Sequence, residues 1–141
     1  MPNFLSADYS ESLIVHFCRA ELLRVEAVGL TSIDLNSRQL CDLELLLNRG
    51  FYPLGGFLDQ GDYLQVLENM HLADGAVWPM PICLDISYEL ATTLRPGQRV
   101  ALNDQEGFLL AILTVSEIWR PEKDMRRRWV TAPRILTCIR A

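Results

Sequence analysis

The spacing of the apolar residues changes near Met70, and this change limits the fold more than any other feature of the chain. Before Met70, apolar side chains recur every three or four positions, which is typical of helices; after it they follow the shorter period of strands. A front half of helices and a back half of strands predicts an α+β fold with a small antiparallel sheet or barrel. The 141 residues are enough for one domain.

Three helices are expected in the front half. The first covers about residues 10–25, where Ser10 or Ser12 could cap it, and residues 29–36 follow as a connector. The second covers residues 37–48 and stops before Gly50. Asp59 can cap the third, which ends near Met70 and carries that side chain on its apolar side.

The back half is expected to begin with a turn over residues 73–76 and to continue in short elements. Residues 77–86 are predicted to form a strand whose prolines confine its first part to an edge or bulge. A short helix over residues 88–94 and a turn at residues 95–98 follow. The last expected elements are two strands over residues 99–102 and 108–118, joined as a hairpin.

The sequence GFYPLGGF at residues 50–57 is too rich in glycine and proline for a regular element, yet too apolar for a solvated loop. Gly55 and Gly56 could form an anion-binding nest, but their apolar neighbours favour a loop that folds onto the core. Trp78 beside two prolines could line a ligand groove, although an aromatic residue at this position is more often part of the core.

The sequence excludes the common local motifs of phosphate and zinc chemistry. Lys123 is the only lysine and stands between two acidic residues, so there is no P-loop. His16 and His71 are the only histidines and are 55 positions apart, which rules out a zinc motif of the HExxH kind. His71 could form an acid–base pair with a nearby carboxylate, but a loop histidine after a helix end is the favoured interpretation. Cys41 lies beside Asp42, whose charge opposes thiol activation, so a packing role on the helix is favoured.

The charges are distributed unevenly along the chain. Residues 1–119 hold 6 basic and 16 acidic side chains, whereas residues 120–141 hold 7 basic and 2 acidic ones. The run RRRW at residues 126–129 could contact nucleic acid, but the acidic body would repel it, so a nucleic-acid partner is not expected. With no membrane span, no secretion signal and four widely spaced cysteines, a cytoplasmic protein with reduced thiols is expected.

The order of the motifs closely resembles the N-terminal domain of ATP sulfurylase (sulfate adenylyltransferase). The resemblance covers roughly residues 30–125, and the segments that carry it are residues 37–48, 50–57, 62–63, 70–85, 97–104, 110–115 and 121–123. It implies a PUA-like fold, a small β-barrel with flanking helices. The family joins ATP and sulfate into adenylyl sulfate and pyrophosphate, in the pathway of sulfate assimilation.

The residues that perform this reaction in the family are not found in the chain. The family's active site lies in a following domain, on a Gln-x-Arg-Asn motif and a His-x-x-His motif, and neither motif occurs here. We therefore assign no catalytic, cofactor-binding or metal-ligating residue, and we expect no cofactor. The chain is expected to be a truncated or isolated accessory domain that is inactive alone and docks on a sulfurylase catalytic domain through apolar surface around residues 51–57 or Trp78.

The resemblance divides the chain into three parts: an N-terminal helical extension at residues 1–29, the PUA-like domain at residues 30–125 and a basic tail at residues 126–141 that does not match. Back-translation of the tail in another frame allows the family's His-Pro-Gly motif, so we hypothesise a frameshift near Met125. Two alternatives to a truncated domain stay open, namely a stand-alone binding module, for RNA by fold analogy, and a regulatory or structural partner of an intact sulfurylase. A homo-oligomer is also possible.

Overall fold

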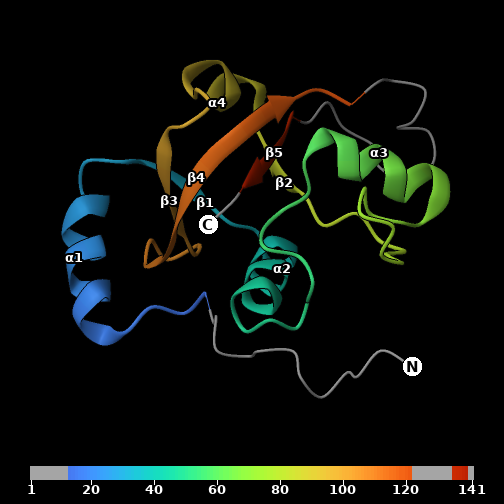
Figure 1. The fold of residues 1–141 in the computed structure, drawn as a ribbon. Helices are drawn as coiled ribbons and strands as arrows, with labels where there is room; N and C mark the ends of the chain where they lie inside the picture. Colours follow the sequence, from blue (N-terminus) through green and yellow to red (C-terminus); the bar gives the residue numbers. More distant parts are fainter. Residues whose placement is uncertain (1–12, 122–134, 140–141) are drawn as a thin grey trace.

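The structure is a computed structural model that describes residues 13–121 and 135–139. Within these stretches helices dominate the first half and strands the second, as the change of period predicts (Figure 1). The elements in chain order are α1 (Phe17–Ala27), β1 (Thr31–Asp34), α2 (Ser37–Leu47), α3 (Gln60–Asn69), β2 (Leu84–Ile86), α4 (Tyr88–Thr93), β3 (Arg99–Asn103), β4 (Leu109–Trp119) and β5 (Ile135–Ile139).

The strands form one sheet in the order β1-β3-β4-β5-β2. β3 and β4 make the expected antiparallel hairpin, with Val100 opposite Leu113, and β5 pairs antiparallel with both β4 and β2. β1 instead runs parallel to β3, with Ile33 opposite Leu102. A mixed, partly barrel-like sheet with helices around it confirms the predicted α+β, PUA-like fold class.

Two strand predictions need correction. The connector expected at residues 29–36 contains β1, which the sequence pattern misses because only Ile33 of its four residues is buried. The strand expected over residues 77–86 is reduced to β2, Leu84–Ile86, and one isolated bridge between His71 and Val77. Pro79 and Pro81 explain the loss, because a proline has no N–H to donate to a neighbouring strand.

No strand is expected from the sequence of the tail, yet the main chain of β5 lies between β4 and β2 in the sheet. The segment reads ILTCI, and its β-branched residues suit a strand. The arginine run at residues 126–129 and the frameshift position near Met125 fall outside the described residues. The frameshift and the three-part division of the chain stay predictions.

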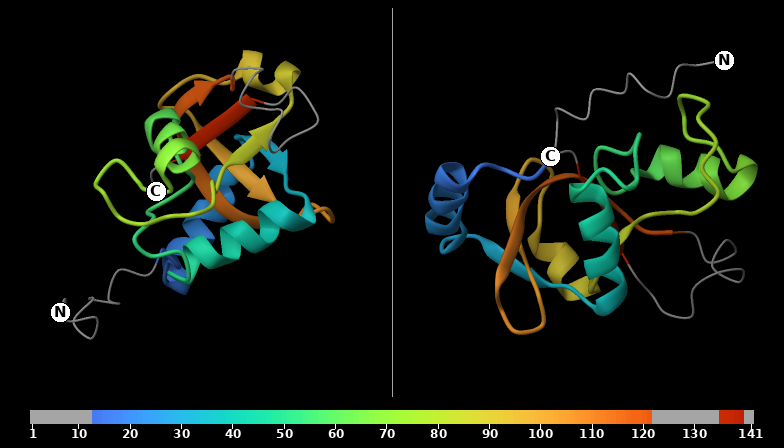
Figure 2. Two further views of the ribbon diagram at one scale, coloured as in Figure 1. Left: turned by 90° about the vertical axis from the view of Figure 1, so that its right-hand side faces the viewer. Right: turned by 90° about the horizontal axis from the view of Figure 1, so that it is seen from below.

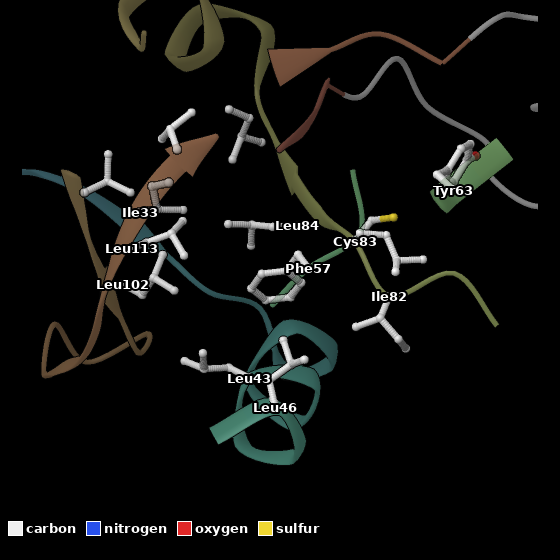
Figure 3. Close-up of a cluster of buried hydrophobic side chains, with 14 of the residues drawn as sticks. Ile33, Leu43, Leu46, Phe57, Tyr63, Ile82, Cys83, Leu84, Leu102 and Leu113 are labelled. Atoms are coloured by element: carbon white, nitrogen blue, oxygen red, sulfur yellow. The ribbon is translucent and has the colours of Figure 1, made fainter. Parts of the chain in front are cut away.

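The core lies between the sheet and α2, with the apolar loop after α2 inserted into it (Figure 3). Alternate residues of β3 and β4 point into this core, so Val100, Leu102, Leu113 and Val115 are buried, and Ala101 on the other face of β3 is buried as well. Phe57 lies at the centre of the cluster between the sheet and α2. The two faces of the sheet are covered differently, since Figures 1 and 2 show α1 on the side of β3 and β4 that is away from α2.

In the described residues, α2 and α3 each begin after a residue whose side chain caps the helix. Asp59 caps α3 by accepting the main-chain N–H of Asp62 at 2.8 Å, as predicted. Asn36 caps α2 in a capping box with Gln39. The start of α1 differs, because His16 is its N-cap residue and makes no side-chain bond, whereas Ser10 and Ser12 lie outside the described residues.

Candidate docking surface

Two segments that are distant in the sequence meet on one side of the molecule, at the contact between Phe51 and Trp78. Their rings are nearly perpendicular, with centroids 5.7 Å apart, a favourable edge-to-face arrangement. Phe51 follows α2 and Trp78 follows the turn after α3, so this contact joins the two loops that were predicted to carry a docking surface.

Around this aromatic pair, four large apolar side chains are exposed. They are Tyr52, Met70, Val77 and Met80, with 53–72% of each residue accessible to solvent. We call these four residues, together with the partly buried Phe51 and Trp78, the docking surface. Clusters of exposed apolar side chains are typical of sites where proteins bind one another.

The second of the two loops is held by hydrogen bonds from α3. The carboxylate of Asp62 accepts the main-chain N–H of Ala73 at 2.7 Å, and the carbonyl of Met70 accepts the N–H of Trp78 at 2.8 Å. Gly75, with a φ of 88°, turns the chain between them, as the turn prediction for residues 73–76 requires. These hydrogen bonds therefore fix the backbone of the loop that carries the exposed residues Val77 and Met80.

Met70 shows where the sequence interpretation fails. Its helical spacing places it on the apolar side of α3, but the residue ends the helix in the left-handed conformation, with a φ of 57°. This backbone turns the side chain away from the helix face, and Met70 is exposed. The only feature of the sequence that indicated the end of the helix near Met70 was the turn that begins three residues later.

The first loop combines a buried anchor with an exposed ring. Leu54, Phe57 and Leu58 are buried, which confirms that the loop folds onto the core rather than forming an isolated anion nest. The guanidinium of Arg49 lies over the ring of Tyr52, 5.3 Å from its centroid, and this cation–π contact stabilises the position of the exposed ring.

Trp78 is half-buried, which agrees with the core interpretation more than with an open groove. Its indole Nε1 is buried and has no hydrogen-bond partner among the residues that the structure describes. The docking surface thus contains one buried N–H donor that has no partner among the described residues.

A polar cluster lies elsewhere, at the start of α2. Arg38 bridges the carboxylates of Asp42 and Asp85 at 3.2 and 3.1 Å, and so joins α2 to β2. Burial raises the pKa of Asp42, the positive charge of Arg38 opposes this rise in pKa, and the charge of Asp85 adds to it. We assign this cluster a structural role, because the guanidinium of Arg38 already forms ion pairs with two carboxylates of the same chain.

The other candidate residues are not brought together. His71 donates from Nδ1 to the carbonyl of Asn69 at 2.5 Å, which confirms the interpretation as a loop histidine after a helix end. Cys41 is exposed on α2, so the expectation that it packs against a neighbour is wrong: its helix turns Leu43 and Leu46 to the core instead. Among residues 13–121 and 135–139, no three His, Cys, Asp or Glu side chains are grouped in a way that could hold a metal ion.

One further concavity is formed at the other end of the molecule, a hollow of about 470 Å³ between α1, β1, β3 and the β3–β4 loop. Its lining mixes apolar, polar and charged residues, and includes Arg24, Val28, Ser32, Asn103 and Phe108. In the described part of the chain, no helix is long and apolar enough to span a membrane.

Comparisons with known proteins identify the family and the fold. A family described as a PUA-like domain matches residues 9–132. The chain belongs to the PUA-like domain family. The match includes part of the N-terminal extension and reaches into the tail.

The curated relatives are sulfate adenylyltransferases. That of Kluyveromyces lactis is 50% identical over 113 residues, which are 79% of this chain and 22% of the relative. That of Schizosaccharomyces pombe is 50% identical over 105 residues, or 73% of this chain and 21% of the relative. The PUA-like chain therefore spans about a fifth of the length of these relatives, and matches their N-terminal portion.

A solved structure described as a hexameric APS kinase from Thiobacillus denitrificans has the same fold, with a TM-score of 0.75 and 34% sequence identity. The alignment covers 92% of this chain and 24% of the other. The resemblance to the N-terminal domain of ATP sulfurylase is thereby confirmed. That no catalytic, cofactor-binding or metal residue lies in the chain stays a prediction.

Proposed function

We propose that this PUA-like chain is the accessory domain of a sulfate adenylyltransferase, inactive by itself, and that its docking surface binds the catalytic part of such an enzyme. The observation that carries the proposal is the exposure of Tyr52, Met70, Val77 and Met80 around the packed Phe51–Trp78 pair. The chain matches only about a fifth of each relative. The remaining four-fifths of a relative is the part that we propose as the binding partner.

The chemistry of the surface favours a protein partner with an apolar contact area. Its side chains are aromatic, aliphatic and thioether groups, which contribute to binding through the burial of apolar surface and not through charge. Methionine and tyrosine are also common at protein interfaces, where their side chains adapt to the partner or supply large contact area. We further propose that the chain acts in the cytoplasm, where thiols such as exposed Cys18 and Cys41 remain reduced.

The binding experiment uses the full chain and the Kluyveromyces lactis relative from which the matching region has been deleted. We expect binding in isothermal titration calorimetry, with a negative heat-capacity change because apolar surface is buried. Val77→Glu and Met80→Glu should each weaken binding at least tenfold, since a carboxylate would have to be desolvated in the contact. Tyr88→Glu is the matched control, because Tyr88 is equally exposed but lies on α4.

Two results would overturn the proposal. Unchanged binding of both docking-surface variants would remove the assigned surface. Formation of adenylyl sulfate from ATP and sulfate by the purified chain alone would show that it is an enzyme and not an accessory domain.

A further inference from the structure

The strand β5 has a neighbour along each of its two edges. Thr137 of β5 lies opposite Ile118 of β4 on one side and opposite Leu84 of β2 on the other. Within residues 13–121 and 135–139, β2 pairs with no strand except β5, so β5 connects β2 to the rest of the sheet (Figure 1). We call the space between residues 84–86 of β2 and residues 115–119 of β4 the β5 slot.

The two walls of the β5 slot belong to the interior of the domain. Leu84 and Val115 are fully buried, and Ile86 and Trp119 are buried as well. Without a strand in the slot, main-chain N–H and C=O groups along both walls would lose their partners next to the core, which is costly. The domain therefore needs an extended segment at this position.

The strand that fills the slot is not part of the region that matches the family. The match to the PUA-like domain covers residues 9–132, so it includes β2 and β4, whereas β5 begins at Ile135. The walls of the slot are therefore shared with the family, while their present occupant comes from outside the matched region.

The curated relatives continue well beyond the portion that matches this chain. That portion is N-terminal and makes up only about a fifth of their length. Consecutive strands of a chain are neighbours in a sheet in most cases. The segment of a relative that directly follows the matched portion is therefore the one expected beside β4, in the place that β5 takes in this chain.

The bonds in the slot allow one strand to replace another. A strand that is added to a sheet binds through its main-chain N–H and C=O groups, which every extended segment without proline carries in the same arrangement. The pairing of β5 with β4 and β2 is of this kind. Side chains that suit the apolar walls then decide which segment binds more tightly.

The covalent connection to β4 gives β5 only a moderate advantage over a separate strand. Residues 120–134 join the two strands, and a tether of this kind gives an effective concentration on the order of millimolar. A separate strand with the same main-chain bonds and better-fitting side chains can therefore displace β5 at concentrations that an experiment reaches.

We propose that the β5 slot binds an extended segment of a sulfate adenylyltransferase in place of β5, and that this segment is the one directly after the matched portion. The inference rests on the proposed function, because the same partner supplies the strand. β5 is then an internal competitor that leaves before the partner's strand enters, and the slot is a second contact, separate from the docking surface.

The first test adds a synthetic peptide to the full, unmodified chain. The peptide covers about 20 residues of the Kluyveromyces lactis relative directly after its match to this chain, enough for a strand of the usual length. At millimolar peptide, hydrogen exchange at residues 135–139 should accelerate at least tenfold, because β5 is released. Exchange in β2 and β4 should stay slow, because the new strand takes over their bonds. Unchanged exchange at residues 135–139 would overturn the proposal.

A variant with a weakened β5 measures the competition. Thr137→Pro removes one main-chain N–H from the middle of β5, where both edges are paired, and so raises the fraction of chains with an open slot. Since the apparent dissociation constant is the intrinsic one divided by this fraction, the variant should bind the labelled peptide at least tenfold more tightly in fluorescence anisotropy. The same peptide with proline at every second position is the control and should bind neither chain. Equal affinity of the two chains would place the peptide outside the slot.

Met80→Glu separates this inference from the proposed function, because Met80 belongs to the docking surface and lies outside the slot. The variant should release β5 on peptide addition as the unmodified chain does. If the docking-surface variants weaken binding of the shortened relative but the peptide leaves β5 in place, only the strand exchange is wrong. If the peptide releases β5 and those variants bind normally, only the docking surface is wrong. A dimer whose copies exchange β5, detected by sedimentation equilibrium, would assign the slot to a second copy and overturn the proposal.

Discussion

The side-chain amide of Gln39 donates to the main-chain carbonyl of Asp85 at 2.8 Å, across 46 positions of sequence. Its Oε1 at the same time accepts the main-chain N–H of Asn36 at 3.0 Å. Gln39 is 3% exposed and is the one buried polar side chain in the described part of the chain. It therefore connects the first turn of α2 to β2 from inside the core.

Replacing Gln39 should destabilise the fold. Gln39→Ala removes one half of the capping box and leaves the partly buried carbonyl of Asp85 without this donor, so we expect a loss of about 2 kcal/mol in the free energy of unfolding. Urea denaturation followed by circular dichroism measures it. Gln65→Ala, at an exposed position of α3, should cost less than about 0.5 kcal/mol. Equal effects of the two substitutions would contradict the assigned role.

Asp42 should give the stability a specific pH dependence. Burial raises the pKa of this carboxyl in the folded chain, while the unfolded chain has the usual value of about 3.9. The folded state then holds the proton more tightly, so the contribution to stability is present at low pH and is lost as the pH rises from about 3.9 through the raised pKa.

Asp42→Asn cannot lose a proton and should remove this loss. The stability of the variant relative to the unmodified chain should therefore increase as the pH rises through that interval, as measured by urea denaturation between pH 3.5 and 7. Glu44→Gln, at an exposed position of the same helix, is the control and should show no such trend. A constant difference between Asp42→Asn and the unmodified chain would rule out the raised pKa.

Asp62 should control the loop that forms half of the docking surface. Asp62→Ala leaves the N–H of Ala73 without its acceptor, so hydrogen exchange of that amide should accelerate by about tenfold, the equivalent of about 1.4 kcal/mol. Asp62→Asn keeps an acceptor oxygen and should retain most of the protection. Glu68→Ala, farther along α3, should leave the exchange of Ala73 unchanged.

Phe57 should be the costliest single truncation among the aromatic residues of the loop after α2. The ring is 2% exposed at the centre of the core, so Phe57→Ala should cost about 3–5 kcal/mol in the free energy of unfolding. Phe108→Ala provides the comparison, because Phe108 is 68% exposed in the β3–β4 loop and should cost less than about 0.5 kcal/mol. A loss below about 1 kcal/mol for Phe57→Ala would place its ring outside the core.

Elements whose signals are local were predictable from the sequence. The helix cap at Asp59, the turn at Gly97 and the hairpin of β3 and β4 each depend on residues within a few positions of one another. The candidate docking segments were predictable for the same reason, since their glycines, prolines and aromatic residues identified two irregular but apolar loops.

By itself, the sequence determined the class of the fold, the family that it resembles and the location of the local elements, because period, capping and turn chemistry act over short stretches of chain. Only the tertiary structure decided that β1 pairs parallel with β3, that Gln39 reaches Asp85 and that the outer face of α1 is left open. The apolar spacing of α1 predicted a buried face, but burial depends on what lies against a helix. That neighbour is set by contacts between distant parts of the chain, which no local pattern contains.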